Sequence, residues 1–244
     1  MSDSEEETDE APATDGAPDP ALRPRAWLEC LAVTLVAGVA LTVAFSDGLA
    51  ESALMIPIVG GAYAVLAVAT LIYLHKRGRL QGELAPRRLD VTLGALVALV
   101  LVLGAMVAEL GLQQRAIGGW MFQLFLQLGD PRGATSAWLG PAVFATALLE
   151  ELVWRGFVMR RLAEAEGAGR ALWFSTLLYA MAHAGTVYTL RDPNVGPNPI
   201  LVVAAAGCGL VWGLVAVRFE RLVPSLAAHA IFSWAVVLFP VWRL

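Results

Sequence analysis

The sequence predicts an all-α protein, a polytopic membrane helix bundle with about seven transmembrane helices and one interfacial helix. Of its 244 residues, 58% are hydrophobic and only 16% are charged, whereas a soluble domain is roughly half apolar and about a quarter charged. Seven apolar segments approach the ~20 residues that one crossing of the bilayer needs. One further segment is too polar to cross the bilayer and has its apolar residues on one side.

The chain begins with an acidic segment. Residues 1–20 hold eight Asp and Glu residues and no Lys or Arg. Such a composition cannot bury enough apolar surface to fold, and it lacks the basic start and the apolar core of a signal peptide. We therefore predict that residues 1–24 form a disordered acidic tail in the cytoplasm.

Seven apolar segments form the predicted spans, and the first three consist almost entirely of Ala, Val, Leu, Gly and Thr. These three fit a scaffold with a lipid-facing wall, and Glu29 and Glu109 lie near span ends, where interfacial water can reach them. Gly209 and Gly213 in the sixth span predict close helix packing. The predicted spans are residues 26–45, 52–74, 90–111, 136–158, 171–190, 199–217 and 222–242.

Residues 112–135 are too polar to span a membrane. Apolar residues recur there at steps of three and four, which is typical of one face of a helix. This pattern predicts an amphipathic helix in the membrane interface, and a loop helix packed on the protein is the alternative. We therefore group residues 25–135 as the N-terminal membrane helices and the interfacial helix. The apolar stripe comprises Ile117, Trp120, Met121, Leu124, Phe125 and Leu128.

The basic residues predict the orientation in the membrane, because Lys and Arg are enriched in cytoplasmic loops. With a cytoplasmic N-terminus, the predicted inside segments hold twelve Lys and Arg residues and the outside segments hold four. We therefore predict a multi-pass protein of the cell membrane with its N-terminus in the cytoplasm and its C-terminus outside. The richness in Arg and Ala is typical of a GC-rich bacterial genome.

Three ionisable residues lie inside the fourth span. A charge in hydrocarbon costs at least ~2.5 kcal/mol, so such residues point to a functional site. Glu151 and Arg155 are four residues apart in the favourable order for a helical ion pair. Glu150 lies about 100° round the helix from Glu151 and is left without a partner from its own helix. Its partners must therefore come from other helices.

Histidines in two other spans supply candidate partners. His75 lies in a basic loop, but His183 and His229 lie inside apolar spans. Tyr179 precedes His183 by four residues and Ser233 follows His229 by four, so each pair shares a helix face. One carboxylate and two imidazoles from three helices predict a polar cluster in the inner half of the bilayer, shielded from lipid.

Three motifs in these spans resemble those of the CPBP intramembrane proteases, also called Abi, which include the type II CAAX prenyl endopeptidases. The family pattern is EExxxR, FxxxH and Hxxx(N/D), on three membrane helices in that order. The resemblance covers roughly residues 136–236 and implies that residues 136–244 form a CPBP-like catalytic membrane core. The matching residues are Glu150-Glu151-x-x-x-Arg155, Tyr179-x-x-x-His183 and His229-x-x-x-Ser233.

The resemblance implies hydrolysis of a peptide bond inside the membrane. Glu150 and His183 would activate a water, and His229, with Ser233, would stabilise the tetrahedral oxyanion. Glu151 and Arg155 would fix the helix and leave Glu150 free to react, and Tyr179 would also support the reacting residues without taking part in the reaction. The chain departs from the family pattern at two positions, because Tyr179 replaces Phe and Ser233 replaces Asn or Asp.

The sequence leaves two possibilities for the reaction, one with a bound metal ion and one without. Glu150, His183 and His229 have side chains that could bind zinc, but the sequence has no HExxH motif and Ser233 is a poor fourth ligand. We therefore predict a metal-independent glutamate mechanism without a cofactor, and zinc is the alternative. The two cysteines lie in separate apolar runs and indicate neither a disulfide framework nor a metal site.

The predicted function is that of an intramembrane endopeptidase acting on a membrane-associated protein or peptide in the lipid bilayer, with no nucleic acid partner. In eukaryotic relatives the substrate is a prenylated CAAX protein. A non-proteolytic CPBP-like membrane scaffold, chaperone or immunity protein is the first alternative, favoured by Ser233. A transporter with a buried proton relay is the second, but the sequence lacks the matched broken helices of that class.

Overall fold

The computed structural model describes residues 18–49, 54–112, 117–128 and 136–238. Within these ranges every regular element is a helix, and the one β-type pairing is an isolated bridge between Asp192 and Gly196. The prediction of an all-α helix bundle is confirmed. The helices are η1 (Pro20–Leu22), α1 (Arg23–Ala44), η2 (Asp47–Leu49), α2 (Met55–Lys76), α3 (Leu80–Leu84), α4 (Asp90–Leu112), α5 (Ile117–Leu128), α6 (Ser136–Glu151), η3 (Leu152–Met159), α7 (Arg160–Glu166), α8 (Ala168–Ala182), α9 (Thr186–Thr189), α10 (Ile200–Phe219) and α11 (Val223–Leu238).

Among the described residues, four helical segments are long and apolar enough to cross a membrane: Pro20–Ala44, Met55–Lys76, Asp90–Ala108 and Ile200–Phe219. They correspond to the first, second, third and sixth predicted spans. Large apolar side chains point outward from each of them, as in Leu35, Val65, Val100 and Val203, which are 66–73% exposed. So much exposed apolar surface is stable only against lipid or a partner, which supports a membrane location.

The other three predicted spans are helical but shorter or interrupted. The fourth predicted span consists of α6 and the π-helical segment η3, which ends one residue beyond it. The fifth predicted span is divided between α8, which has 15 residues, and the four-residue helix α9. The seventh corresponds to α11, whose described part has 16 residues. α8 and the described part of α11 are each shorter than the ~20 residues of a full crossing. The fourth, fifth and seventh predicted spans together carry the predicted site.

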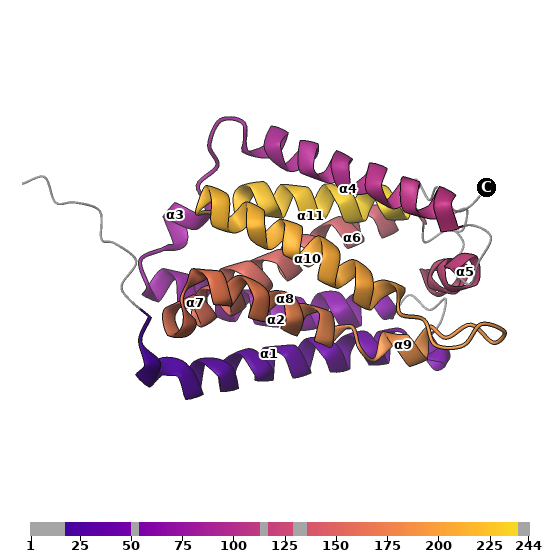
Figure 1. Cartoon of the computed structure of the whole chain (residues 1–244), viewed down its shortest axis with the longest axis horizontal. Helices are drawn as coiled ribbons and strands as arrows, with labels where there is room; N and C mark the ends of the chain where they lie inside the picture. The colour runs from indigo at the N-terminus through magenta and orange to yellow at the C-terminus, as the bar shows by residue number, and fades with distance from the viewer. Residues whose placement is uncertain (1–17, 50–53, 113–116, 129–135, 239–244) are drawn as a thin grey trace, which may run out of the picture.

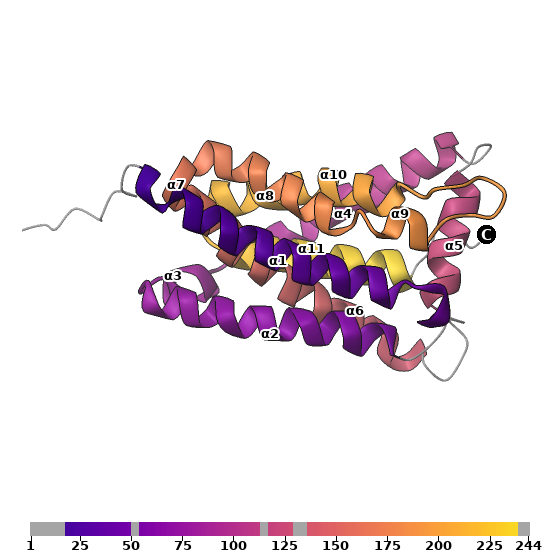
Figure 2. The same cartoon turned by 90° about the horizontal axis from the view of Figure 1, so that it is seen from below.

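The helices run roughly along one axis in a layered bundle (Figures 1 and 2). α11 packs between α4 and α6, α10 packs on α8, and α1 packs on α2 and α8. The predicted close packing around Gly213 is present, because a Cβ at this position would lie 2.5 Å from Leu172 Cδ1. At the turn between α7 and α8, Gly167 has a φ of 86°, a left-handed conformation that favours glycine.

α5 is the helix that the amphipathic pattern predicts within residues 112–135. It lies across one end of the bundle instead of along its axis (Figures 1 and 2). It packs against the segment after α9, because Trp120 Nε1 donates to the Gly196 carbonyl at 3.3 Å and Asn198 Nδ2 donates to the Trp120 carbonyl at 2.9 Å. The helix thus packs on the protein, and its location in the membrane interface stays a prediction.

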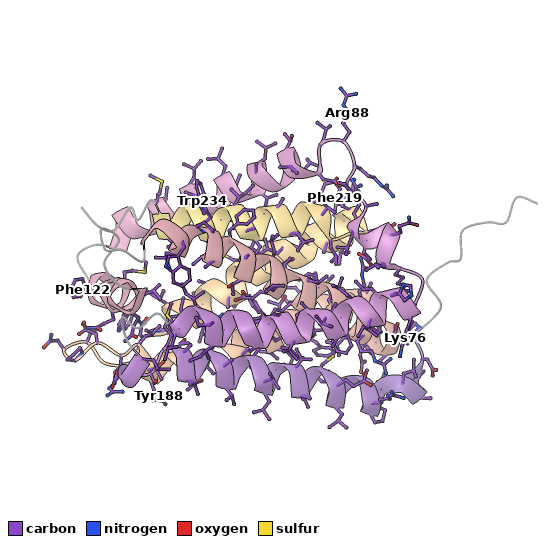
Figure 3. All side chains as sticks on the ribbon, turned by 180° about the vertical axis from the view of Figure 1, so that it is seen from behind. Lys76, Arg88, Phe122, Tyr188, Phe219 and Trp234 are labelled. Carbon is purple, nitrogen blue, oxygen red and sulfur yellow. The ribbon has the colours of Figure 1, made fainter. Side chains whose placement is uncertain are left out.

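Lys76 and Arg88, at the two ends of one predicted inside segment, lie at the same end of the bundle, opposite Phe122 and Tyr188 (Figure 3). Interhelical ion pairs join this end, and Arg161 binds Glu29 Oε2 at 2.6 Å and Glu164 Oε2 at 2.8 Å. Burial alone would lower the pKa of the Arg161 guanidinium, but its hydrogen bonds to these carboxylates raise it above the ordinary value. The orientation of this end toward the cytoplasm remains a prediction.

The predicted tail, residues 1–24, falls mostly outside the described residues, which begin at residue 18. Within its described part, helical structure begins at Pro20, earlier than the predicted boundary at residue 25. The Asp19 backbone N–H donates to the Glu164 carbonyl at 2.9 Å, and the Asp19 carboxylate caps η1. This contact with α7 orders the chain before α1. The division of the chain into three parts stays a prediction.

Candidate active site

The three motifs lie on four elements of the bundle, the first on α6 and η3, the second at the end of α8 and the third on α11. Glu150 and Glu151 are the last two residues of α6, and Arg155 lies in η3. His183 forms the C-terminal cap of α8, and His229 lies on α11. The structure therefore brings together six of the seven residues singled out in the sequence: Glu150, Glu151, Arg155, Tyr179, His183 and His229.

The EExxxR motif spans the change from α-helix to π-helix. η3 runs from Leu152 to Met159, and all but one of its eight residues are buried. Single π-helical turns inside α-helices occur frequently at functional sites. The wider turn begins directly after two adjacent carboxylates, of which Glu150 contacts Tyr179 of α8 and Glu151 contacts His229 of α11. Apolar periodicity gave no signal for this change.

Glu151 forms the predicted ion pair with Arg155, with 3.2 Å between Glu151 Oε2 and Arg155 Nη1. Both side chains are almost completely buried. The same carboxylate oxygen also lies 3.2 Å from His229 Nδ1. Glu151 therefore serves two partners, and its contact with the histidine of α11 was not predicted.

Arg155 is held by more than its carboxylate partner. Its Nη2 donates to the backbone carbonyl of Gly209 on α10, and its guanidinium lies over the rings of Tyr179 and Trp212, at 5.1 and 5.8 Å from the ring centroids. Cation–π contacts of this kind stabilise a desolvated guanidinium. Arg155 thus joins η3 to α8 and α10.

Glu150 has its contacts on other helices, as predicted from its unpaired position. Its Oε2 accepts a hydrogen bond from the Tyr179 hydroxyl at 3.0 Å. The same oxygen lies 3.9 Å from His229 Nε2. The side chain retains 12% exposure, whereas Glu151 has none, so Glu150 is the carboxylate that a small molecule can reach.

His183 is oriented by the backbone of its own helix. Its Nδ1 lies 2.9 Å from the Tyr179 carbonyl oxygen, which can only accept, so Nδ1 carries a proton in this arrangement. In the neutral tautomer Nε2 then has the free lone pair. Thr186 Oγ1 donates to the His183 carbonyl at 2.6 Å and fixes the turn that follows α8.

His229 is held between a carboxylate and an indole ring. Its ring stacks on Trp212 of α10, with 3.7 Å between the ring centroids and 19° between the planes. Because Nδ1 faces Glu151, Nε2 is the nitrogen that faces Glu150. The two ring nitrogens thus face different carboxylates, Nδ1 facing Glu151 and Nε2 facing Glu150.

Ser233 lies one turn after His229 on α11 and is partly exposed. In the described part of the chain its hydroxyl makes no hydrogen bond with a site residue. The structure therefore does not connect Ser233 to the cluster, and its part in oxyanion stabilisation stays a prediction.

Two residues of α10 belong to the site but were not singled out as site residues. Trp212 stacks on His229. The sequence alone does not distinguish a tryptophan that contacts a site from one that only packs in an apolar span. Gly209 was assigned to helix packing, yet it also accepts the Arg155 hydrogen bond. A Cβ at Gly209 would lie 2.9 Å from Tyr179 Cδ1, so the absence of a side chain makes room for the tyrosine ring.

The described residues contain no group of three or more His, Cys, Asp or Glu side chains placed to hold one metal ion.

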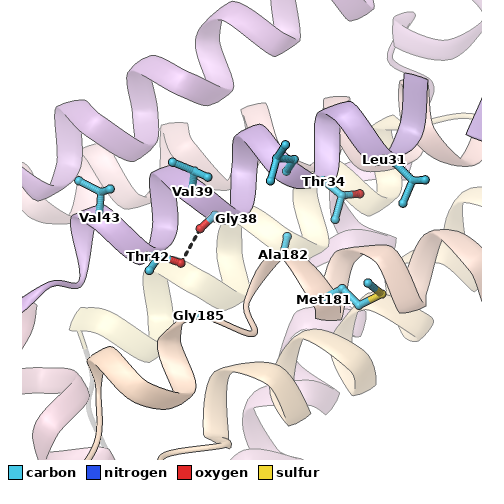
Figure 4. Close-up of a pocket in the computed structure, with 10 residues that line it drawn as sticks. Leu31, Thr34, Gly38, Val39, Thr42, Val43, Met181, Ala182 and Gly185 are labelled. Carbon is cyan, nitrogen blue, oxygen red and sulfur yellow. Dashed lines mark hydrogen bonds between the residues drawn. The ribbon is translucent and has the colours of Figure 1, made fainter. Parts of the chain in front are cut away.

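An open apolar groove of about 470 Å³ lies between α1 and α8 (Figure 4). Leu31, Val39, Val43 and Met181 line it, and the Thr42 hydroxyl is bound to the Gly38 carbonyl at 2.7 Å. None of the predicted site residues lines this groove, so it lies apart from the polar cluster.

Comparison with known families identifies the region that holds the cluster. Residues 132–235 match the family model described as type II CAAX prenyl endopeptidase Rce1-like. This match contains all three motifs and confirms the family resemblance drawn from them. No curated protein and no solved structure matches the chain.

Proposed function

We propose that this chain, whose residues 132–235 match the type II CAAX prenyl endopeptidase Rce1-like family, is an intramembrane endopeptidase that hydrolyses a peptide bond in a membrane-associated protein. The observation that carries this proposal is the position of Glu150. Its carboxylate lies in a helix bundle, partly accessible, with a tyrosine hydroxyl at 3.0 Å and an imidazole nitrogen at 3.9 Å. A partly buried carboxylate beside an imidazole is suited to proton transfer.

In the proposed mechanism, Glu150 and His183 activate the attacking water. His183 Nδ1 is occupied by the Tyr179 carbonyl, so Nε2 can accept a hydrogen bond from the water and orient it. Glu150 takes a proton as the water oxygen attacks the substrate carbonyl. The protonated Glu150 then gives this proton to the leaving amine, because an acid and base in one position can serve both steps.

His229 would stabilise the oxyanion through Nε2. With Nδ1 facing Glu151 at 3.2 Å, Nε2 is the ring nitrogen on the side of Glu150, and an Nε2–H would donate to a developing negative charge on the substrate. A preorganised donor in a dry site stabilises such a charge strongly. Glu151 then fixes the orientation of His229, as well as pairing with Arg155.

The proposed function is tested by finding the substrate. The membrane proteome of cells that lack this protein is compared with that of cells that carry the wild type or Glu150→Ala. We expect a membrane protein to be shortened only in cells with the wild type. If wild type and Glu150→Ala give the same membrane proteome, but the protein binds a stable partner, the non-proteolytic scaffold is the better reading.

Variants at positions 229 and 233 test the oxyanion assignment. A serine hydroxyl can donate a hydrogen bond as an asparagine amide can, but with a shorter reach. We expect Ser233→Asn to keep or raise turnover, and Ser233→Ala to lower it by up to about 10²-fold. His229→Ala should cost more than Ser233→Ala, because only His229 contacts the cluster. Turnover of one substrate is measured for all variants in one detergent, and if His229→Ala is silent, the assignment to α11 is wrong.

Chelators test the proposed metal-independent mechanism. If Glu150 and His183 activate water by themselves, a strong chelator such as EDTA should leave the cleavage rate unchanged. The rate is measured before chelation, after chelation, and after zinc is added back. Loss of activity that zinc restores would show that the site uses a metal, which is the alternative reading.

A further inference from the structure

We infer that Tyr179 is a positioning residue that holds the carboxylate of Glu150 in its reactive orientation and couples it to His183. The inference rests on the proposed function. It is carried by the hydrogen bond from the Tyr179 hydroxyl to Glu150 Oε2 at 3.0 Å. Tyr179 stands where the family pattern has phenylalanine, so this hydrogen bond is a feature of this chain and not of the pattern.

The ring of Tyr179 is fixed from several directions. It packs edge to face against Trp154 at 5.2 Å between centroids and against His183 at 4.9 Å. Arg155 lies over it, and Gly209 leaves the space that the ring fills. The side chain is 3% exposed. A phenol held in this way has one direction for its hydroxyl, and that direction is toward Glu150.

This hydrogen bond makes the two oxygens of Glu150 different. Oε2 accepts from Tyr179 and lies 3.9 Å from His229 Nε2. Among the described residues Oε1 has no hydrogen-bond partner, so it is the oxygen available to a water. When Glu150 takes the proton of the water at Oε1, the Tyr179 hydroxyl can continue to donate to Oε2, because a protonated carboxyl retains an acceptor oxygen. Tyr179 therefore directs the proton to one oxygen and prevents the carboxylate from turning away.

Tyr179 also links the two groups that act on the water. Its hydroxyl binds Glu150, its ring contacts His183, and its backbone carbonyl accepts from His183 Nδ1 at 2.9 Å. A single residue thus sets the direction of the carboxylate and of the imidazole. A small displacement of either group from its reactive position can cost a large part of the rate.

Tyr179→Phe removes only the hydroxyl and keeps the packed ring. Tyr73→Phe is the matched control, because the Tyr73 hydroxyl also donates to a carboxylate, Glu164 Oε1 at 2.8 Å, away from the cluster. The substrate is the membrane protein whose shortening depends on Glu150, purified and reconstituted with each variant. We expect Tyr179→Phe to lower kcat about tenfold, as for loss of one hydrogen bond to a charged group, with KM unchanged. Tyr73→Phe should keep the wild-type kcat.

An infrared spectrum adds a measurement that needs no substrate. The carboxylate band of Glu150 is identified as the band that Glu150→Gln removes. It should shift in Tyr179→Phe and stay in place in Tyr73→Phe. A wild-type kcat in Tyr179→Phe would overturn the inference while cleavage itself stands, whether or not the band shifts. Absence of any cleavage by the wild type would instead overturn the proposed function, and these two failures are distinguishable.

Discussion

Glu150→Ala and His183→Ala should each reduce cleavage by at least about 10²-fold, and by as much as about 10⁴-fold if the base acts alone. Glu150 supplies the carboxylate that takes the proton from water, and no other carboxylate can replace it. Glu151 is completely buried and occupied by Arg155 and His229. His183 supplies its Nε2 to orient the water, because its Nδ1 is bound to the Tyr179 carbonyl.

The loss should concern catalysis and not folding. Both variants should accumulate in the membrane at wild-type levels, and their melting temperatures in detergent should change little compared with their rates. His75→Ala is the control for the histidine, since His75, which the sequence predicts in a basic loop, lies exposed in the last turn of α2. Substrate turnover, normalised to the amount of folded protein, decides the outcome. An active Glu150→Ala variant would remove Glu150 from the mechanism.

Arg155→Ala should strongly reduce the yield and the thermal stability of the protein. It leaves Glu151 buried without its guanidinium, and breaking a buried ion pair by removing one partner costs about 3–5 kcal/mol. It also removes the hydrogen bond to the Gly209 carbonyl and the contacts with two aromatic rings. Since these contacts join η3 to α8 and α10, the loss affects the packing around the whole cluster.

Arg25→Ala is the matched control for Arg155→Ala. Arg25 also pairs with a glutamate four residues away, Glu29, at 2.8 Å, but its side chain is 78% exposed. Exposed pairs of this kind contribute little to stability. Melting temperatures of both variants and the wild type in the same detergent test the difference. Equal melting temperatures for all three proteins would show that the buried ion pair is not structural.

The sequence was sufficient for the architecture and for most of the cluster, because both depend on features of single helices. Apolar run lengths located all seven main helical segments. The four-residue spacing of Glu151 and Arg155 predicted their ion pair, and the unpaired position of Glu150 predicted contacts from other helices. Helical spacing also placed Tyr179 beside His183.

The rest depends on how helices pack, which single-helix patterns do not contain. Which nitrogen of His229 meets which carboxylate is set by the rotation of α11 against α6, so its contact with Glu151 was missed. The stacking of Trp212 on His229 depends in the same way on α10. Periodicity also gave no indication of the π-helical turn at η3. Ser233 shares a helix face with His229, yet this alone did not bring it to the cluster.

The most direct test of the central claim, that Glu150 activates a water to hydrolyse a peptide bond, is cleavage of the identified substrate in vesicles prepared with H₂¹⁸O. Wild type and Glu150→Gln are compared, because glutamine keeps the shape of the side chain and can still accept from Tyr179 but cannot take the proton. We expect ¹⁸O in the new C-terminal carboxyl group of the wild-type product and no product with Glu150→Gln. Cleavage by Glu150→Gln at the wild-type rate would contradict the account, as would a wild type that moves protons across the vesicle membrane but cleaves nothing.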